Sequence, residues 1–267
     1  MFDFKGFAIF LLPTVLTLLT TLVLLPWTKL FPRLSMRPTV EGRSLAIAAL
    51  TLLAVLTSYL LSTYGQSSLV SLFLSANIIS VAKLPLPAWL IFVGCFLFLD
   101  FLFYVVHYVL HRVPMFWRFH AIHHSDEHVT ALSTFLHHPV ELVISYVVLI
   151  VFAVVLGIPL VVIFVHGLLG AIHGAFTHAD IAMPRSVDRV LRWIVITPDT
   201  HRTHHSVRMD EGNSNFGSMF IFWDVLFGTY VARPSVPEAE LQMGLPSDAC
   251  PTTFSALSLL LYPFKRR

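Results

Sequence analysis

Long apolar segments constrain this chain more than any other feature of its sequence. A helix needs about 20 mostly apolar residues to cross a bilayer, and four regions are long enough: 6–30, 44–62, 87–111 and 140–177. The last is nearly twice the length of one span, and Gly-Ile-Pro at 157–159 predicts a tight turn between two antiparallel helices. Only 12% of the residues are charged, about half the fraction typical of soluble domains. The sequence therefore predicts an all-α, polytopic membrane bundle of about four or five transmembrane helices.

Two apolar stretches and the cysteines need separate interpretation. The run at 7–31 follows a single basic residue, Lys5, and lacks a clear cleavage site, so it is interpreted as a retained span and not as a signal peptide. Residues 68–82 are apolar but short, which suits a re-entrant or interfacial segment. Cys95 is interpreted as a small core residue, because Cys95 and Cys250 are too few for a disulfide framework or a zinc ribbon.

The distribution of basic residues predicts the orientation, because cytoplasmic loops are enriched in Lys and Arg. The loop between the first two spans carries four basic residues, Lys29, Arg33, Arg37 and Arg43. The N-terminus is then outside, and every Lys and Arg of the chain except Lys5 and Lys83 falls inside. We therefore expect an integral, multi-pass membrane protein with its histidine-rich segments on the cytoplasmic side.

Fourteen histidines are unusual in a chain so poor in charge. Eight of them form three clusters: His107 and His111; His120, His123 and His124; and His201, His204 and His205. Residues three and four apart share a helix face, so each cluster is expected to present its imidazoles in one direction. Imidazole is a common ligand of Fe, Zn, Cu and Ni, and so many imidazoles exceed what one ion can coordinate. The clusters therefore predict two metal ions.

The other histidines are interpreted one by one. His178, at the end of the hairpin, is a further candidate ligand, because ionisable groups at membrane depth usually have a function. His138 stays open between a ligand and a residue that supports the ligands. Four are interpreted as bystanders: His166 and His173 in packing or a substrate channel, His128 as exposed, and His137 in neither role.

One carboxylate, Asp100, lies inside the third span, where an unpaired charge is costly. Positions 100, 104, 107 and 111 fall on one helical stripe, so Asp100 and Tyr104 face the same way as His107 and His111. A metal-bound histidine usually donates its other N–H to a carboxylate or carbonyl. Asp100 is therefore a candidate for orienting these ligands, and a structural hydrogen bond near the centre of the span is the alternative.

Several motifs around the histidines match one known family. They are HPVE at 138–141, TPDTHRTHHS at 197–206, NFG at 215–217 and WDVLFGTY at 223–230. Together with the closely spaced first two clusters, they make residues 95–232 resemble the fatty acid hydroxylase/sterol desaturase superfamily. Leu136 and Asp180 stand where many members carry arginine and asparagine, which affects the expected substrate and local detail but not the three main clusters.

The resemblance implies a membrane-bound di-iron enzyme with a helical bundle and a cytosolic helical cap that carries the histidines. It implies two iron ions, with zinc possible in a purified sample, and nine metal ligands: His107, His111, His120, His123, His124, His178, His201, His204 and His205. Residues expected to hold these ligands in place are Asp100, Tyr104, His138, Glu141 and Asp224. The expected division is 1–94 for N-terminal spans, 95–232 for the catalytic region with the hairpin at 140–177, and 233–267 for a C-terminal tail.

The function implied by the resemblance is hydroxylation or desaturation of a lipid, such as a sterol or a fatty acyl chain, with O₂ and external electrons. The sequence contains no haem or flavin motif and no cysteine set for an iron–sulfur cluster. We therefore expect a separate electron donor of the cytochrome b5, ferredoxin or reductase type, and no nucleic-acid partner.

Two alternatives from other classes remain open at this stage. A membrane metal transporter or sensor would need polar residues along the spans, and only His166 and His173 interrupt the hairpin in this way. A zinc-dependent lipid hydrolase would use similar ligands, because imidazole alone does not exclude zinc. A plain fatty-acid desaturase also has similar histidine clusters, but the short 111–120 spacing and the WDVLFGTY segment favour the sterol desaturase type.

Overall fold

The computed structural model describes residues 4–32, 41–61, 80–237, 240–246, 249 and 254–265, and these form helices without a β-sheet. The α-helices are α1 (Phe4–Leu30), α2 (Arg43–Leu60), α4 (Ala88–Arg112), α5 (Pro114–His120), α6 (Pro139–Leu156), α7 (Leu160–His178), α8 (Arg185–Leu191), α9 (Pro198–His204), α10 (Met209–Gly212), α11 (Phe222–Phe227) and α12 (Ala256–Leu261). Short 3-10 turns are η2 (Val81–Lys83), η3 (His123–Ser125), η4 (Ala131–Phe135) and η6 (Tyr262–Phe264).

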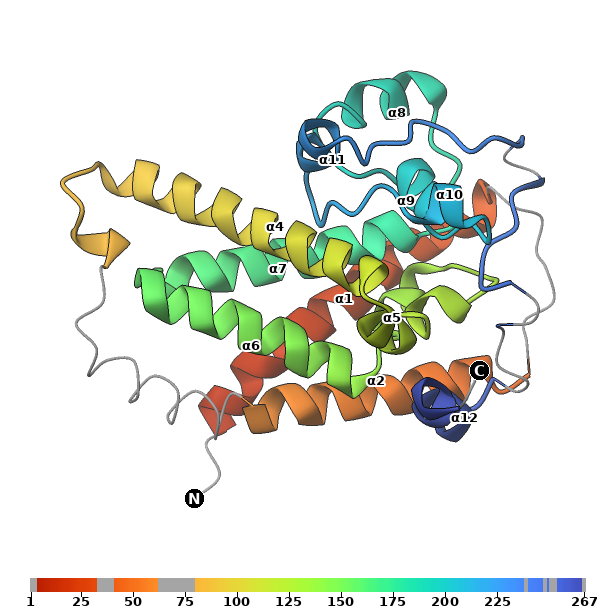
Figure 1. Cartoon of the computed structure of the whole chain (residues 1–267), viewed down its shortest axis with the longest axis horizontal. Coiled ribbons are helices and arrows are strands. Elements are labelled where there is room, and N and C mark those ends of the chain that lie inside the picture. The colour runs from red at the N-terminus through yellow and green to blue at the C-terminus, as the bar shows by residue number, and fades with distance from the viewer. Residues whose placement is uncertain are drawn as a thin grey trace.

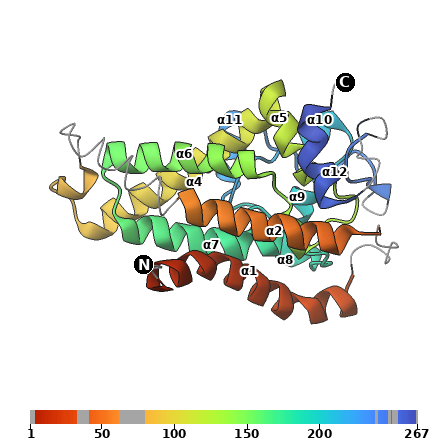
Figure 2. The same ribbon diagram turned by 90° about the horizontal axis from the view of Figure 1, so that it is seen from below.

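Four helices, α2, α4, α6 and α7, are long and apolar enough to cross a membrane, and 15–30 of α1 forms a shorter apolar helix. They run side by side along the long axis of the molecule, with α1 on the outer side of α7 (Figures 1 and 2). Large apolar side chains on their outer faces are exposed, for example Leu22, Val23, Leu45 and Leu52. The predicted all-α class is confirmed, and the outer faces are suited to contact with lipid.

The hairpin turn forms where the sequence predicts it. Gly157 ends α6 with φ 60°, a left-handed conformation that glycine adopts without strain, and Pro159 precedes the first turn of α7. Close to the turn, Cys95 and Leu99 of α4 pack with Ala153 and Val162 of the hairpin. Cys95 is therefore a buried core residue, as expected.

The short helices α5, α9 and α10 gather at the end of the bundle where α4 ends (Figure 1). Helix α4 stops at Arg112 because Val113 precedes a proline and is extended, and Pro114 then occupies the first turn of α5. Arg43, at the start of α2, donates two hydrogen bonds to the buried carboxylate of Asp126, just after η3. This ion pair joins the bundle to the group of short elements α5, η3, α9 and α10 at this end, here called the cap.

The C-terminal segment packs on the bundle as well. Leu259 of α12 and Tyr262 of η6 lie in one core cluster with Ile47 and Leu50 of α2. The expected division of the chain at residues 94 and 232, and the orientation in the membrane, stay predictions. Of the stretch 68–82, only 80–82 lie among the described residues, and Cys250 lies outside them.

Gly157→Ala tests the hairpin turn. A Cβ at this position would lie 2.8–3.0 Å from atoms of Ser80, and a left-handed alanine costs about 1–2 kcal/mol. We expect a clearly lower unfolding temperature of the purified protein in detergent. Gly167→Ala is the control, because its Cβ meets nothing within 4 Å in helix α7 and alanine is the better helix former. Equal stability of both variants would contradict the assigned turn.

Candidate metal centre

Helix ends deliver the histidines to one place. His107 and His111 lie in the last turns of α4, and His178 is the last residue of α7. Helix α5 ends at His120, and His123 and His124 follow in the 3-10 turn η3. The 120–124 cluster does not lie in one continuous α-helix, because a turn at 121–122 separates α5 from η3, although Ala121 and Ile122 keep right-handed helical backbone angles.

Helix α9 carries the third cluster. Thr197 caps its N-terminus by accepting a hydrogen bond from the Thr200 amide, and Pro198 occupies the first turn. His201 and His204 lie within the helix, and His205 is its C-terminal cap residue. The structure thereby brings all nine predicted ligand residues to the same end of the bundle.

The nine histidines form two groups, in each of which the potential ligand atoms lie within 4.8 Å of one another. The five-histidine group contains His107, His111, His120, His124 and His204. The four-histidine group contains His123, His178, His201 and His205. Neighbouring residues of one cluster, such as His123 and His124, therefore belong to different groups, so each HxxHH cluster contributes to both.

In the five-histidine group, the protein holds the Nδ1 side of the rings. His107 Nδ1 lies 2.9 Å from the carbonyl oxygen of Phe216, and His204 Nδ1 lies 2.7 Å from that of Ser214. A carbonyl only accepts, so these Nδ1 atoms carry the proton and each Nε2 keeps its lone pair. His111 Nδ1 is 3.3 Å from Asn213 Oδ1.

The Nε2 atoms of this group are buried without a hydrogen-bond partner in all five members. An unpaired buried polar atom is costly, and native structures seldom keep several together. Nε2 atoms gathered in one space would be satisfied together if they coordinated a cation. The five-histidine group therefore fits a metal ion.

The four-histidine group converges more tightly. His178 Nε2 lies 2.9 Å from His201 Nε2 and 3.2 Å from His123 Nε2, and His205 Nε2 is 3.2 Å from His201 Nε2. The carbonyl of Gly174 accepts from His178 Nδ1 at 2.7 Å, which leaves the His178 Nε2 lone pair facing its neighbours. A cation placed among these nitrogens would be coordinated by four imidazoles.

Burial keeps these rings in the form that binds metals. It lowers the pKa of His123, His124, His201, His204 and His205 well below 6.5, and the neighbouring imidazoles lower it further. A neutral imidazole is the form that coordinates a metal ion.

A cavity of about 270 Å³ leads from the histidines into the bundle. Its apolar wall includes Phe103, Val106 and Leu110 of α4 and Leu142 of α6. Gly170 and Gly174 of α7, which carry no side chain, line it as well, and both histidine groups contribute rings. The cavity therefore connects an apolar space between long helices to the candidate metal centre.

A family model, fatty acid hydroxylase, matches residues 92–229. This chain belongs to the fatty acid hydroxylase family. The matched segment begins in α4 and ends just after α11, so it contains all nine histidines.

Known relatives resemble this family member over part of its length. An ornithine lipid hydroxylase of Rhizobium tropici is 32% identical over 142 residues, which are 53% of this chain and 42% of the relative. An alkylglycerol monooxygenase of Caenorhabditis elegans is 30% identical over 57% of this chain and 29% of its own length. A very-long-chain aldehyde decarbonylase of rice is 29% identical over 55% of this chain and 56% of the relative. The chain thus spans less than two thirds of these relatives. No solved structure matches the chain.

Glu141 contacts a histidine of the five-histidine group, and it has an unexpected second partner. Its Oε1 accepts from His120 Nδ1 at 2.9 Å and from His137 Nδ1 at 3.0 Å. His137 was expected to be a bystander, but its ring also stacks on His123 with centroids 4.4 Å apart. Burial alone would lower the pKa of His137, but the charge and hydrogen bond of Glu141 raise it above the usual value. The i, i+4 spacing of His137 and Glu141 was the available signal.

Asp100 makes structural hydrogen bonds, which was the alternative interpretation of this residue. It holds the loop before α11 and does not orient a histidine ligand. Its carboxylate accepts from the amide of Met219 at 3.1 Å and from Trp223 Nε1 at 2.9 Å. Among the histidines, His166 lies nearest in the structure, with Nε2 3.9 Å from Asp100 Oδ1. His166 also stacks on Phe103, which agrees with its expected packing role.

Asp224 and Tyr104 do not touch the histidines but belong to a hydrogen-bond network that holds the backbone at Phe216. Asp224 accepts from the amides of Phe216 and Gly217, and its Oδ1 also accepts from Thr229 Oγ1. Burial raises the pKa of Asp224 to about 6, even though the hydrogen bonds from these donors lower it. Tyr104 is hydrogen-bonded to the same threonine at 3.0 Å. This network fixes the Phe216 carbonyl that orients His107.

The remaining histidines lie outside the two groups. His138 caps α6 by accepting from the Val140 amide, and its Nε2 is 3.3 Å from the Leu260 carbonyl, so it has a structural role. His173 is half-buried on α7 beside Phe176. His128 is half-buried and belongs to neither group.

Glu141→Ala tests the support of His120. The imidazole loses its acceptor, and loss of such a partner typically lowers metal affinity by roughly 10–100-fold. We expect this loss in a chelator-competition titration with Fe²⁺, with a smaller loss for Glu141→Gln, which keeps an acceptor oxygen. Glu240→Ala, at an exposed carboxylate, is the control. Unchanged affinity in Glu141→Ala would refute this role.

Proposed function

We propose that this chain is a membrane-bound di-iron oxygenase that hydroxylates the hydrocarbon part of a lipid, with O₂ and electrons from a separate donor. The observation that carries the proposal is the pair of buried imidazole groups at the end of an apolar cavity. All nine histidines are proposed as ligands, five for one iron and four for the other. Bound iron would supply the activation of O₂ that insertion of oxygen into an unactivated C–H bond requires.

The protein contributes position and exclusion of water. Phe103, Val106 and Leu142 would hold an extended alkyl chain against the histidines, because such side chains offer it no competing hydrogen bonds. A volume of about 270 Å³ lies just below the usual range for small-molecule pockets, about 300–1,000 Å³. It therefore suits a segment of one chain, with the polar head of the lipid left outside.

The relatives favour oxygen insertion into a lipid with a polar head. One is named for hydroxylating ornithine lipids and another for oxygenating alkylglycerols. A lipid with straight chains is therefore our proposed substrate class. Entry between the long helices would let the chain reach the centre without leaving an apolar environment.

The two other classes of function have weaker support. A metal transporter would need a polar path, but the cavity walls next to the histidines carry Phe103, Val106, Leu110 and Leu142. Catalytic zinc sites usually use three protein ligands and an open position, and groups of five and four imidazoles exceed this number. We further propose that the histidine end faces the cytoplasm, on the distribution of Lys and Arg.

His204→Ala and His205→Ala test the two groups separately. Each residue belongs to a different group, so each single variant should weaken one of two iron-binding phases by roughly 10-fold or more, and the double variant should weaken both. Elemental analysis and Fe²⁺ titration of the purified protein measure this. His128→Ala should bind two ions like the unaltered chain. Two tight ions in the double variant would refute the assignment.

Gly170→Leu tests the cavity as the lipid site. The new side chain would extend into open space, because a Cβ at Gly170 meets no atom within 4 Å, and Gly170 lines the cavity. Displacing the lipid chain by about 1 Å can cost roughly 100-fold in rate. We expect loss of lipid product with iron content retained. The measurement is lipid mass spectrometry of cells with and without the protein.

The matched control is Gly167→Leu, on the same helix, exposed and equally free of neighbours within 4 Å. A product that gains one oxygen atom supports hydroxylation, and a product that loses two hydrogens would show desaturation instead. Full product formation by Gly170→Leu would exclude this cavity as the substrate site.

A further inference from the structure

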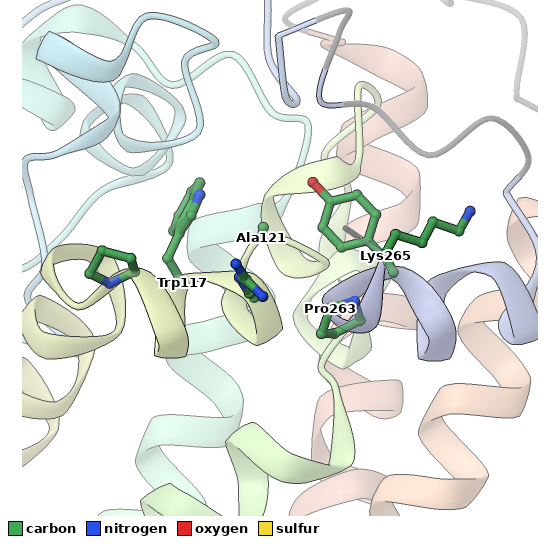
Figure 3. A pocket seen from close by; sticks show the side chains of 7 residues that line it. Trp117, Ala121, Pro263 and Lys265 are labelled. Carbon is green, nitrogen blue, oxygen red and sulfur yellow. The ribbon is translucent and has the colours of Figure 1, made fainter. Parts of the chain in front are cut away.

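A second pocket, of about 240 Å³, opens between α5 and the C-terminal turn η6. Figure 3 shows Trp117 and Ala121 on its α5 side, with Pro263 and Lys265 opposite them. Arg118 also lines the pocket. None of its lining residues belongs to the nine histidines, so it is distinct from the lipid cavity.

The rim of this pocket is positively charged. Arg118 and Lys265, which line the pocket, are exposed. Arg112, six residues before Arg118 at the end of α4, is exposed as well. No lining residue of the pocket is acidic, and within the described part of the chain these three side chains form no ion pair with a carboxylate. Unneutralised cations on one surface attract and orient an acidic partner.

Trp117 connects this pocket to the five-histidine group. Its ring lines the pocket, and its centroid lies 4.9 Å from that of His111 and 5.4 Å from that of His124. A single indole ring thus separates the surface from two candidate ligands.

We propose that this pocket is the docking site of an acidic one-electron carrier protein, and that Trp117 is the contact through which electrons reach the five-histidine group. The inference rests on the proposed oxygenase function, which requires external electrons. In each docking event the carrier is oxidised by one electron and the metal centre is reduced by one electron, and no bond forms or breaks. Trp117 is here a positioning and conducting residue, without contact to the lipid.

The charges favour a protein carrier over a lipid headgroup as the occupant. Electron-transfer complexes are small and transient, and charge complementarity controls their rate of association. This pocket is small, and the two cations on its rim provide the charge that an acidic carrier would complement. Its aromatic ring leads from the surface to the candidate metal ligands. Exposed Met115 and Phe264 nearby would also suit a lipid surface, so the experiment includes that occupant.

The first measurement is binding. The full chain in phosphatidylcholine nanodiscs is titrated with two acidic probes, the soluble haem domain of a cytochrome b5 and a [2Fe–2S] ferredoxin. We expect at least one probe to bind, with affinity that falls as salt rises. The double variant Arg118→Glu/Lys265→Glu should weaken that binding by roughly 10-fold or more.

The control carries the same change of charge elsewhere. Arg185→Glu/Arg189→Glu alters two exposed residues of α8 and should leave probe binding unchanged. Equal weakening by both double variants, or no binding of either probe at low salt, would overturn the proposal. So would unaltered probe binding by Arg118→Glu/Lys265→Glu together with lost binding of phosphatidylglycerol vesicles, which would assign the pocket to lipid.

The second measurement is reduction of the iron-loaded protein in anaerobic stopped flow. Trp117→Leu should lower the ratio of the probe-driven rate to the dithionite-driven rate by about 10-fold, and Trp117→Phe, which keeps a ring, should restore most of it. An unchanged ratio in Trp117→Leu would refute the role of the indole. Failure of the chain to bind iron would refute the proposed function, whereas the binding measurement would still decide the docking site.

Discussion

The burial of many neutral imidazoles in one small volume is the constraint on which the rest of the structure depends. Nine rings lie at one end of the bundle, and five Nε2 atoms there have no hydrogen-bond partner. Such an arrangement is unfavourable by itself, because desolvated polar atoms normally find partners. The interactions that hold it together are therefore found around the rings: backbone carbonyls and one carboxylate occupy their Nδ1 sides, and helix ends fix their positions.

Buried carboxylates have different tasks in this framework. Asp126 receives Arg43 and joins the first described turn of α2 to the cap. Asp100 and Asp224 hold the chain around α11, by accepting from the amides of Met219 and Phe216. Glu141 alone contacts a ring of the five-histidine group. Three of these four acids thus act on loops, which explains how a centre made of distant segments keeps its geometry.

Local sequence patterns predicted the parts that local interactions determine. The apolar runs, the turn at Gly157 and the membership of His178 in the centre follow from patterns within a few residues. In both HxxHH clusters the first and last histidines share a group and the middle one joins the other group. This division was not predicted, because it depends on which histidines of α4 and α7 lie beside each ring. The hydrogen-bond donors of Asp100 lie 119 or more positions away in the chain, so no local pattern identifies them. The contact of His137 with Glu141 had a local signal in their i, i+4 spacing, whereas its stacking on His123 depends on packing between segments.

Helix α5 has a consequence for how the two proposed binding events relate. It is seven residues long, and it presents His120 to the lipid cavity but Trp117 and Arg118 to the basic pocket. A lipid and an electron carrier bound on the two sides would therefore not compete for the same space. Both would nevertheless act on the five-histidine group, since His120 belongs to it and Trp117 contacts His111. Pro114 and the chain turn at 121–122 bound this short helix, so its residues would move together. A shift of α5 caused by one partner would therefore change the position of a ring that the other partner uses. If both proposed binding events occur, coupling between them would follow from this shared helix and would need no long-range pathway.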